Sequence, residues 1–277
     1  MNGQKNEIVI FCKSFYRDVE RVKILLESVS RFNKDKIPFY ISVPSDNIKL
    51  FKDQLGTTGY NLIEDESING ERLEKEGREG WVNQQVTKLG FWKLGICYNY
   101  VSVDSDGYFI RQFGIEDFIA DIDTHTPYTV MHEQKDLFSW TAKSTSLLGF
   151  DPQTSFAEHI TLGQEVFGRS VKRLYDFGPL PIYSCAVWSS LDEHYIKPNN
   201  LSLKNILNQI SNEFTWYGET LFAFKTIEIW PVEPIFKMFH YMQQYREYKN
   251  SGYTEQDWAK NYLGICMQSS SGLPPKY

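Results

Sequence analysis

Two aspartates separated by a single residue, Asp104 and Asp106, follow an apolar segment of the chain. Residues 98–103 are rich in Tyr and Val, which predicts a buried strand that ends at the acid pair. Ligands of α/β sheets bind at the carboxyl ends of strands, and two carboxylates so close together favour a divalent cation as counterion. Mg²⁺ or Mn²⁺ fits best, because such ions combine one or two carboxylates with water and the oxygens of a nucleotide diphosphate.

The acid pair is also compatible with a capped turn that carries two solvated acids. An EF-hand is excluded, because a start at Asp104 puts Phe109 at the required glycine and a start at Ser102 ends on Phe113. A strand followed by D-x-D-G also matches haloacid-dehalogenase-type phosphatases, in which the first Asp, here Asp104, is the nucleophile. Against a phosphatase, Tyr108 replaces the usual Thr or Val, and the motif follows the fourth predicted strand instead of the first.

The chain before the acid pair alternates strand and helix patterns. We expect strands at 8–12, 39–43, 60–63 and 98–103, and the periodicity between them predicts helices at 19–32, 47–55 and 81–94. Residues 64–79 carry ten charges in sixteen positions and are expected to form an exposed loop. This order predicts an α/β fold with a mostly parallel sheet covered by helices.

The predicted helix 81–94 places an amide and an ammonium on one stripe. Trp81, Gln85, Lys88 and Trp92 are spaced by four, three and four residues, so they share a helix face. The ordinary alternative is that Lys88 runs along the two indole rings into water.

The second half of the chain is less regular but ends in three helical patterns. We expect helices at 203–210, 214–224 and 235–245, and strands near 128–132 and 182–188. Glu213 and Glu219 lie near the start of the second helix, with side chains about 120° apart, so they should not serve one reacting atom together. Glu213 follows the predicted cap Ser211-Asn212 and is the better candidate for a general base, whereas Glu219 is expected to anchor an acceptor or face solvent. His240 falls on the third predicted helix.

Composition narrows the class of protein. The chain has 277 residues and a net charge of −6, and this negative charge argues against nucleic acid as a partner. Its aromatic content of 16% is compatible with either a sugar-binding surface or an aromatic-rich core. The four cysteines form no zinc-type pair, and no apolar run reaches 18 residues. With no signal-peptide pattern at the N-terminus, we expect a cytoplasmic protein with at most a peripheral membrane contact.

Several short motifs, in order, resemble the GT-A glycosyltransferases. Gly80-Trp81, Gln84-Gln85 and Lys88-Leu89 come first, then the Asp104-Ser105-Asp106 strand, then Glu213-Phe214 with Tyr217-Gly218-Glu219. Together they resemble a bacterial GT-A-like family whose members are mostly uncharacterised. The resemblance spans most of the chain, although residues 111–180 match none of its motifs.

This resemblance implies a metal-dependent transfer of a sugar from a nucleotide-diphosphate donor to a bacterial surface glycan, such as capsule, O-antigen or lipooligosaccharide, or to a lipid-linked glycan. It implies one continuous GT-A domain, with a nucleotide-sugar-binding half at 1–110 and an acceptor-binding half at 111–277, working at the inner face of the inner membrane. A non-catalytic carbohydrate-binding protein with the same fold remains the alternative.

The resemblance also assigns expected roles. Asp106 would bind Mn²⁺ or Mg²⁺, Asp104 would lie near the ribose or a metal-bound water, and His240 would be a third metal ligand. The expected catalytic residues are Glu213 and Glu219. The expected nucleotide-sugar contacts are Ser14, Arg17, Asp18, Ser45, Gln85, Lys88, Asp104 and Ser105.

Overall fold

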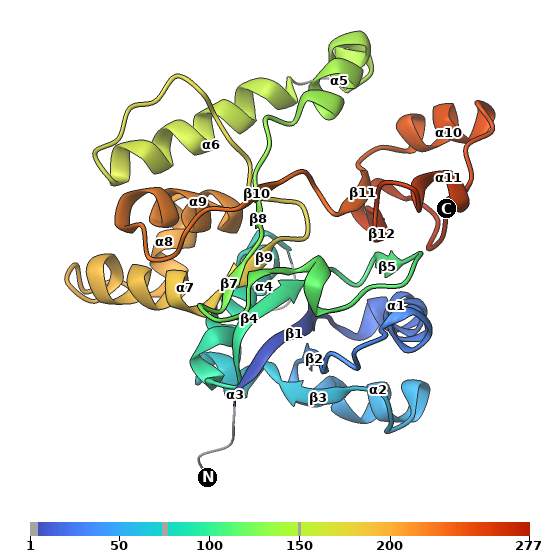
Figure 1. The fold of residues 1–277 in the computed structure, drawn as a ribbon, viewed down its shortest axis with the longest axis horizontal. Helices are drawn as coiled ribbons and strands as arrows, with labels where there is room; N and C mark the ends of the chain where they lie inside the picture. Colours follow the sequence, from blue (N-terminus) through green and yellow to red (C-terminus); the bar gives the residue numbers. More distant parts are fainter. Residues whose placement is uncertain (1–4, 74–76, 149–150) are drawn as a thin grey trace.

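The computed structural model describes residues 5–73, 77–148 and 151–277, which form a mixed α/β fold around one central sheet (Figure 1). The strand order is β3-β2-β1-β4-β9; the first four strands run parallel, and β9 is antiparallel to β4. These strands are β1 (Asn6–Lys13), β2 (Phe39–Val43), β3 (Asn61–Glu64), β4 (Cys97–Ser102) and β9 (Ile182–Ser184). The predicted fold, a mostly parallel sheet flanked by helices in a single domain, is confirmed.

Strand β1 supplies side chains to both faces of the sheet, because successive residues of a strand point in opposite directions. Ile8, Ile10 and Cys12 belong to one buried cluster, and Val9 and Phe11 belong to another. The helices that pack on the first cluster are α1 (Val19–Phe32) and α2 (Ile48–Leu55). Those that pack on the second are α4 (Gly77–Gly90), α7 (Cys185–Leu191), α8 (Leu203–Gln209) and α9 (Glu213–Phe224).

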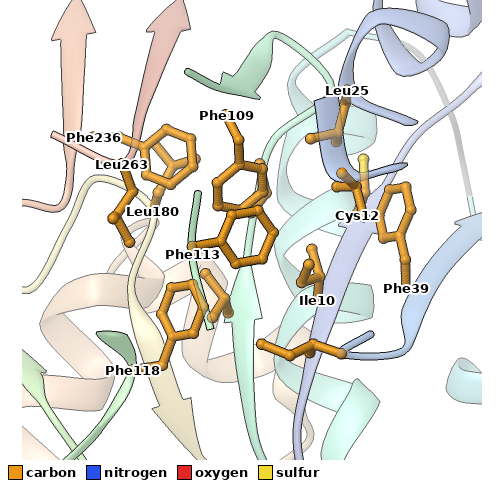
Figure 2. Close-up of a cluster of buried hydrophobic side chains, with 14 of the residues drawn as sticks. Ile10, Cys12, Leu25, Phe39, Phe109, Phe113, Phe118, Leu180, Phe236 and Leu263 are labelled. Carbon is orange, nitrogen blue, oxygen red and sulfur yellow. The ribbon is translucent and has the colours of Figure 1, made fainter. Parts of the chain in front are cut away.

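A smaller sheet extends the first cluster toward the C-terminus. It has the order β11-β12-β5, formed by Phe236–Phe239, Gly264–Met267 and Gly107–Phe109. Figure 2 shows Phe109 of β5 against Phe113 and Phe236; the ring centroids of Phe109 and Phe113 are 3.8 Å apart. The residues directly after the acid pair are therefore held by strands from the end of the chain.

The helix predicted at 235–245 is wrong in its first half. Residues 236–239 form β11, which pairs in parallel with β12, and the helix α10 begins only at Met242 and ends at Asn250. The backbone groups of β11 are paired with a strand that lies 28 residues further along the chain, from Phe236 to Gly264. That distant pairing overrides the helical spacing of the apolar residues.

The loop predicted at 64–79 is also only partly correct. Residues 65–69 form a short helix, α3 (Asp65–Asn69), and Asp65 is buried in an ion pair with Lys13 at 2.9 Å. Helix α4 begins at Gly77, four residues earlier than expected, and residues 74–76 lie outside the described residues. The ion pair therefore anchors the beginning of the charged segment, residues 64–79, to the end of β1.

The region that follows β5 contains elements that periodicity did not reveal, and the strand expected at 182–188 turns into α7 after Ser184. The additional helices are α5 (Lys135–Leu148), α6 (Pro152–Val166) and α11 (Glu255–Trp258). The additional strands are β6 (Ile119–Asp121), β7 (Thr126–Pro127) and β10 (Pro231–Val232), whereas the strand expected near 128–132 is present as the short β8 (Thr129–Val130). Figure 1 shows α5 and α6 at the opposite end of the molecule from β3, and α10 and α11 beside the smaller sheet. Among the helices of the described residues, none is long and apolar enough to cross a membrane.

Candidate functional site

The two aspartates that follow β4 lie in different surroundings. The Asp104 side chain is about one third exposed, at 35%, and its Oδ1 lies 2.5 Å from the ammonium of Lys88. The Asp106 carboxylate is tied to the end of β12 and the residues after it: Oδ2 accepts a hydrogen bond from the Ser269 amide at 2.8 Å, and Oδ1 accepts one from the Cys266 thiol at 3.1 Å. Asp104 is thus the acid of the pair with more open surface, and Asp106 is the anchored one.

Lys88 is buried between two acids from distant parts of the chain. Its Nζ lies 2.5 Å from Asp104 Oδ1 and 3.5 Å from Glu213 Oε1, and only 7% of the residue is exposed. Burial alone would lower the pKa of Lys88, but the charges of Asp104 and Glu213 outweigh it and hold that pKa above its usual range. The alternative in which Lys88 runs along indole rings into water is therefore wrong.

Trp81 and Gln85, which share the predicted face of α4 with Lys88, differ in exposure. Trp81 is 50% exposed, whereas Gln85 is buried. Within the described parts of the chain, neither amide atom of Gln85 has a hydrogen-bond partner. A buried amide without partners is costly, so Gln85 is prepared to hydrogen-bond a polar ligand or water.

The two glutamates of α9 contact different cations. Asn212 caps the helix by accepting a hydrogen bond from the Thr215 amide at 3.0 Å, which places Glu213 in the first turn, as expected. Burial raises the pKa of Glu213, and the charge of Lys88 opposes that shift. Glu219 instead pairs with Arg169 at 3.1 Å and is 3% exposed, so the expectation that it faces solvent is wrong.

The loop after β1 brings a third acid toward the pair. Burial raises the pKa of Asp18, with further contributions from the charges of Asp106 and Asp104, while a hydrogen bond from the Ser105 hydroxyl opposes the shift. Ser14 is buried, and its carbonyl oxygen accepts a hydrogen bond from the Lys13 ammonium at 2.5 Å. The structure therefore brings Asp18 close to the acid pair and to Ser105, and the expected contacts of these residues with a nucleotide sugar stay predictions.

The end of β2 is held by the charged segment. The Ser45 amide donates to Glu66 Oε2 at 3.0 Å, and its hydroxyl donates to Oε1 of the same residue at 2.9 Å. Beside it, Arg72 pairs with Asp46 at 2.6 Å. Ser45 is thus already hydrogen-bonded inside the protein, and its predicted contact with a nucleoside would have to replace or share these bonds.

A cavity of about 320 Å³ lies at the carboxyl ends of β1 and β2. Its lining includes Lys13, Phe15, Arg17, Pro44, Trp81 and Asn83. Two cations, two acids (Asp65 and Glu66) and an exposed indole thus line one cavity, and one of the cations, Arg17, is a predicted nucleotide contact. Lys13 was missed by sequence reasoning; its signal was a lysine at the end of an otherwise apolar strand.

The acid pair fits a divalent cation in charge but does not supply a complete ligand set. Burial and the charge of Asp104 raise the pKa of Asp106, so a cation between the two carboxylates would relieve a real repulsion. Over residues 5–73, 77–148 and 151–277, no group of three or more His, Cys, Asp or Glu side chains is arranged to hold a metal ion. Asp104 and Asp106 therefore fit an ion that takes its remaining ligands from water and a bound diphosphate.

His240 does not lie on a helix, contrary to the sequence-based expectation. It follows β11 directly, and its backbone amide donates to Gln244 Oε1 at 2.9 Å. Burial lowers the pKa of His240 to about 4, so its imidazole is neutral at neutral pH. Its side chain lines a second cavity, and among the described residues it does not join Asp104 and Asp106 in a preformed three-ligand group.

Comparison with solved structures finds a similar architecture in mouse xyloside xylosyltransferase 1. Mouse xyloside xylosyltransferase 1, in its apo form, superposes with a TM-score of 0.52 at 7% sequence identity, covering 96% of this chain and 99% of that one. This likeness shows a GT-A-like fold over nearly the whole chain. No curated protein matches the sequence significantly. The model of a family described as "Family of unknown function (DUF6492)" matches residues 8–163, more than half of the sequence, and the chain therefore belongs to that family.

Proposed function

We propose that this protein is a glycosyltransferase that moves a sugar from a nucleotide-diphosphate donor to a glycan acceptor. The observation that carries the proposal is the buried Lys88 ammonium, held between Asp104 and Glu213 at the carboxyl end of β4. Three groups thus meet at the ligand-binding edge of a GT-A-like sheet: a metal-ligand candidate (Asp104), a cation (Lys88) and a general-base candidate (Glu213).

The donor nucleotide would occupy the 320 Å³ cavity beside this cluster. Arg17 supplies positive charge for phosphate oxygens, Lys13 shares its charge with Asp65 at 2.9 Å, and the exposed ring of Trp81 supplies a flat surface for a base or a sugar. Gln85, with its unpartnered amide, lies one helical turn beyond Trp81 on α4 and would hydrogen-bond the donor or an ordered water.

Asp104 and Asp106 would hold Mn²⁺ or Mg²⁺, with His240 as a candidate third ligand only if its loop moves. The ion would neutralise charge on the leaving diphosphate. The residues of the chain then have separate tasks: Asp106 is fixed by Ser269 and Cys266, whereas Asp104 can exchange its contact with Lys88 for one with the ion.

Glu213 would act as the general base of an inverting transfer. The acceptor oxygen forms a bond to the anomeric carbon, the bond from that carbon to the diphosphate oxygen breaks with its electron pair, and the acceptor proton moves to the Glu213 carboxylate. Burial favours the protonated product of that step, and Lys88 keeps the starting carboxylate charged. Glu219, held by Arg169, would position the acceptor side of α9.

The family resemblance in the sequence supports a bacterial surface glycan as acceptor and the inner face of the inner membrane as the place of work. The division into a donor half at 1–110 and an acceptor half at 111–277 belongs to the same proposal. β5 pairs with β12 near the end of the chain and so joins the acid pair to the second half.

A panel of nucleoside diphosphates tests the proposal, each measured for its effect on the thermal unfolding temperature with and without Mn²⁺. We expect at least one nucleotide to raise that temperature, and Asp106→Asn to remove the part of the increase that depends on Mn²⁺. An unchanged temperature across the panel would contradict the proposal. Binding without release of diphosphate from any nucleotide sugar would favour a non-catalytic carbohydrate-binding protein, and release of inorganic phosphate from phosphate esters would favour the phosphatase.

A further inference from the structure

A second cavity, of about 390 Å³, opens between β11 and the segment that leads into α5. Its polar lining includes His132, Asp136, Lys237, His240, Gln244 and Tyr262. These residues differ from those that line the cavity at the ends of β1 and β2, so the two cavities are separate.

Lys237, on β11, is a buried cation inside a ring of aromatic side chains. The residue is 5% exposed, and its Nζ lies 5.0 Å from the ring centroid of Tyr248, 5.1 Å from that of Trp258 and 5.9 Å from those of Phe239 and Tyr262. Ring faces stabilise an ammonium electrostatically, but they leave its three N–H groups without lone pairs to bind.

The ammonium of Lys237 is also poorly matched with negative charge. Its one ion-pair partner in the described ranges is Asp136, with 3.8 Å between Nζ and Oδ2, beyond hydrogen-bond distance, and the Asp136 side chain is 82% exposed. Of the other acids that line the cavity, Glu133 already pairs with Lys135 at 2.8 Å, and Glu233 forms no ion pair with Lys237 within the described residues. Burial accordingly lowers the pKa of Lys237, and the charge of Asp136 only partly opposes that effect.

We propose that this cavity binds an oxyanion, a carboxylate or a phosphate, through the Lys237 ammonium. A buried ammonium with unused donors gains charge-assisted hydrogen bonds from such a group, and Asp136 is exposed enough to move aside. That the oxyanion belongs to the sugar acceptor rests on the proposed transferase function.

The position of the cavity agrees with an acceptor site. Phe239 of β11 pairs with Met267 of β12, and the Met267 amide donates to the backbone oxygen of Asp106 at 2.9 Å. The strand that carries Lys237 is thus separated from Asp106 by one strand.

Calorimetric titration with three sugars tests the proposal in the absence of nucleotide and metal. D-glucuronate carries the carboxylate, D-glucose 6-phosphate carries the phosphate, and D-glucose is the uncharged control of the same shape. For the wild-type chain we expect at least one of the two anions to bind 10-fold or more tightly than glucose. The anion that binds identifies the class of acceptor.

Two substitutions should change that affinity in opposite directions. Lys237→Met keeps the aromatic packing and should weaken anion binding 10-fold or more, whereas Asp136→Asn removes the competing carboxylate and should tighten it about 3-fold. Lys237→Arg is the matched control that keeps the charge and should retain binding, which also covers the case in which Lys237→Met fails to fold. Equal anion affinity in wild type, Lys237→Met and Asp136→Asn, or no preference over glucose, would overturn the proposal.

This result is independent of the transferase activity. Anion binding that depends on Lys237 and Asp136 in a chain that turns over no nucleotide sugar would support the cavity proposal and contradict the proposed function. Turnover of a nucleotide-sugar donor, together with anion binding that does not depend on Lys237, would support the proposed function and contradict the cavity proposal.

Discussion

Two of the buried lysines, Lys88 and Lys237, have surroundings that differ in kind. Lys88 lies between the carboxylates of Asp104 and Glu213, whereas Lys237 lies among four aromatic rings with one exposed carboxylate at 3.8 Å. Carboxylates raise the pKa of the first ammonium, and burial lowers that of the second. Removing the first ammonium would strand a buried charge, whereas the second ammonium has hydrogen-bond donors left for a ligand.

Lys88→Met should have the largest effect on stability. It leaves the buried carboxylate of Glu213 without a partner, and we expect a loss of about 3 kcal/mol in the free energy of unfolding, together with loss of turnover. Urea denaturation of the variant measures this loss. Glu213→Gln in the same background should recover part of it, because the uncompensated charge is then removed; a loss below about 0.5 kcal/mol would show that the Lys88 cluster is a weak surface interaction.

Glu213→Gln alone should cut turnover by about 10²-fold or more with donor affinity unchanged, the scale expected for loss of a general base. Steady-state kinetics and nucleotide titration measure the two quantities separately. Glu219→Gln is the matched control on the same helix, since it breaks the contact with Arg169 instead. Loss of turnover in Glu219→Gln with normal turnover in Glu213→Gln would reverse the assignment, and normal turnover in both would indicate a retaining mechanism without a protein base.

The aspartate pair should separate into an anchored and an adaptable member. Asp106→Asn should abolish Mn²⁺-dependent turnover, and it should also lower the free energy of unfolding by about 1–2 kcal/mol, because its oxygens accept from Ser269 and Cys266. Asp104→Asn should impair turnover less. Thermal unfolding and turnover against Mn²⁺ concentration test this; an Asp106→Asn variant with wild-type turnover at low Mn²⁺ would show that the pair is only a turn.

Lys237→Met should lower the free energy of unfolding less than Lys88→Met does. Replacing it breaks one long ion pair with an exposed acid and removes contacts with the rings, but methionine packs on aromatic rings in its place. We expect a change within about 1 kcal/mol in urea denaturation. A loss as large as that of Lys88→Met would show that Lys237 supports the fold and not a ligand.

The first half of the fold was predictable because its signals are local. Short apolar runs and helical spacing along residues 8–55 reproduce β1, α1 and β2 to within a few residues. The acid pair was found for the same reason, since the strand before it and the turn after it lie within ten residues.

The parts that sequence reasoning missed depend on distant contacts. The partner of Lys88, Glu213, is 125 residues away, and no spacing rule connects them. Strand β11 was mistaken for a helix because its parallel partner, β12, is found only in the folded chain. Helix α6 is different: Asp151 caps it and Pro152 is its first residue, a start signal that could have been recognised.

A crystal of the protein soaked with Mn²⁺ and a mixture of nucleotide sugars would show directly where the ion and the donor bind. We expect the ion against Asp104 and Asp106, the diphosphate beside it with Lys88 in reach, and the nucleoside in the cavity that Lys13, Arg17 and Trp81 line. A nucleotide bound in the Lys237 cavity instead, or an ion that leaves both aspartates uncontacted, would contradict the account.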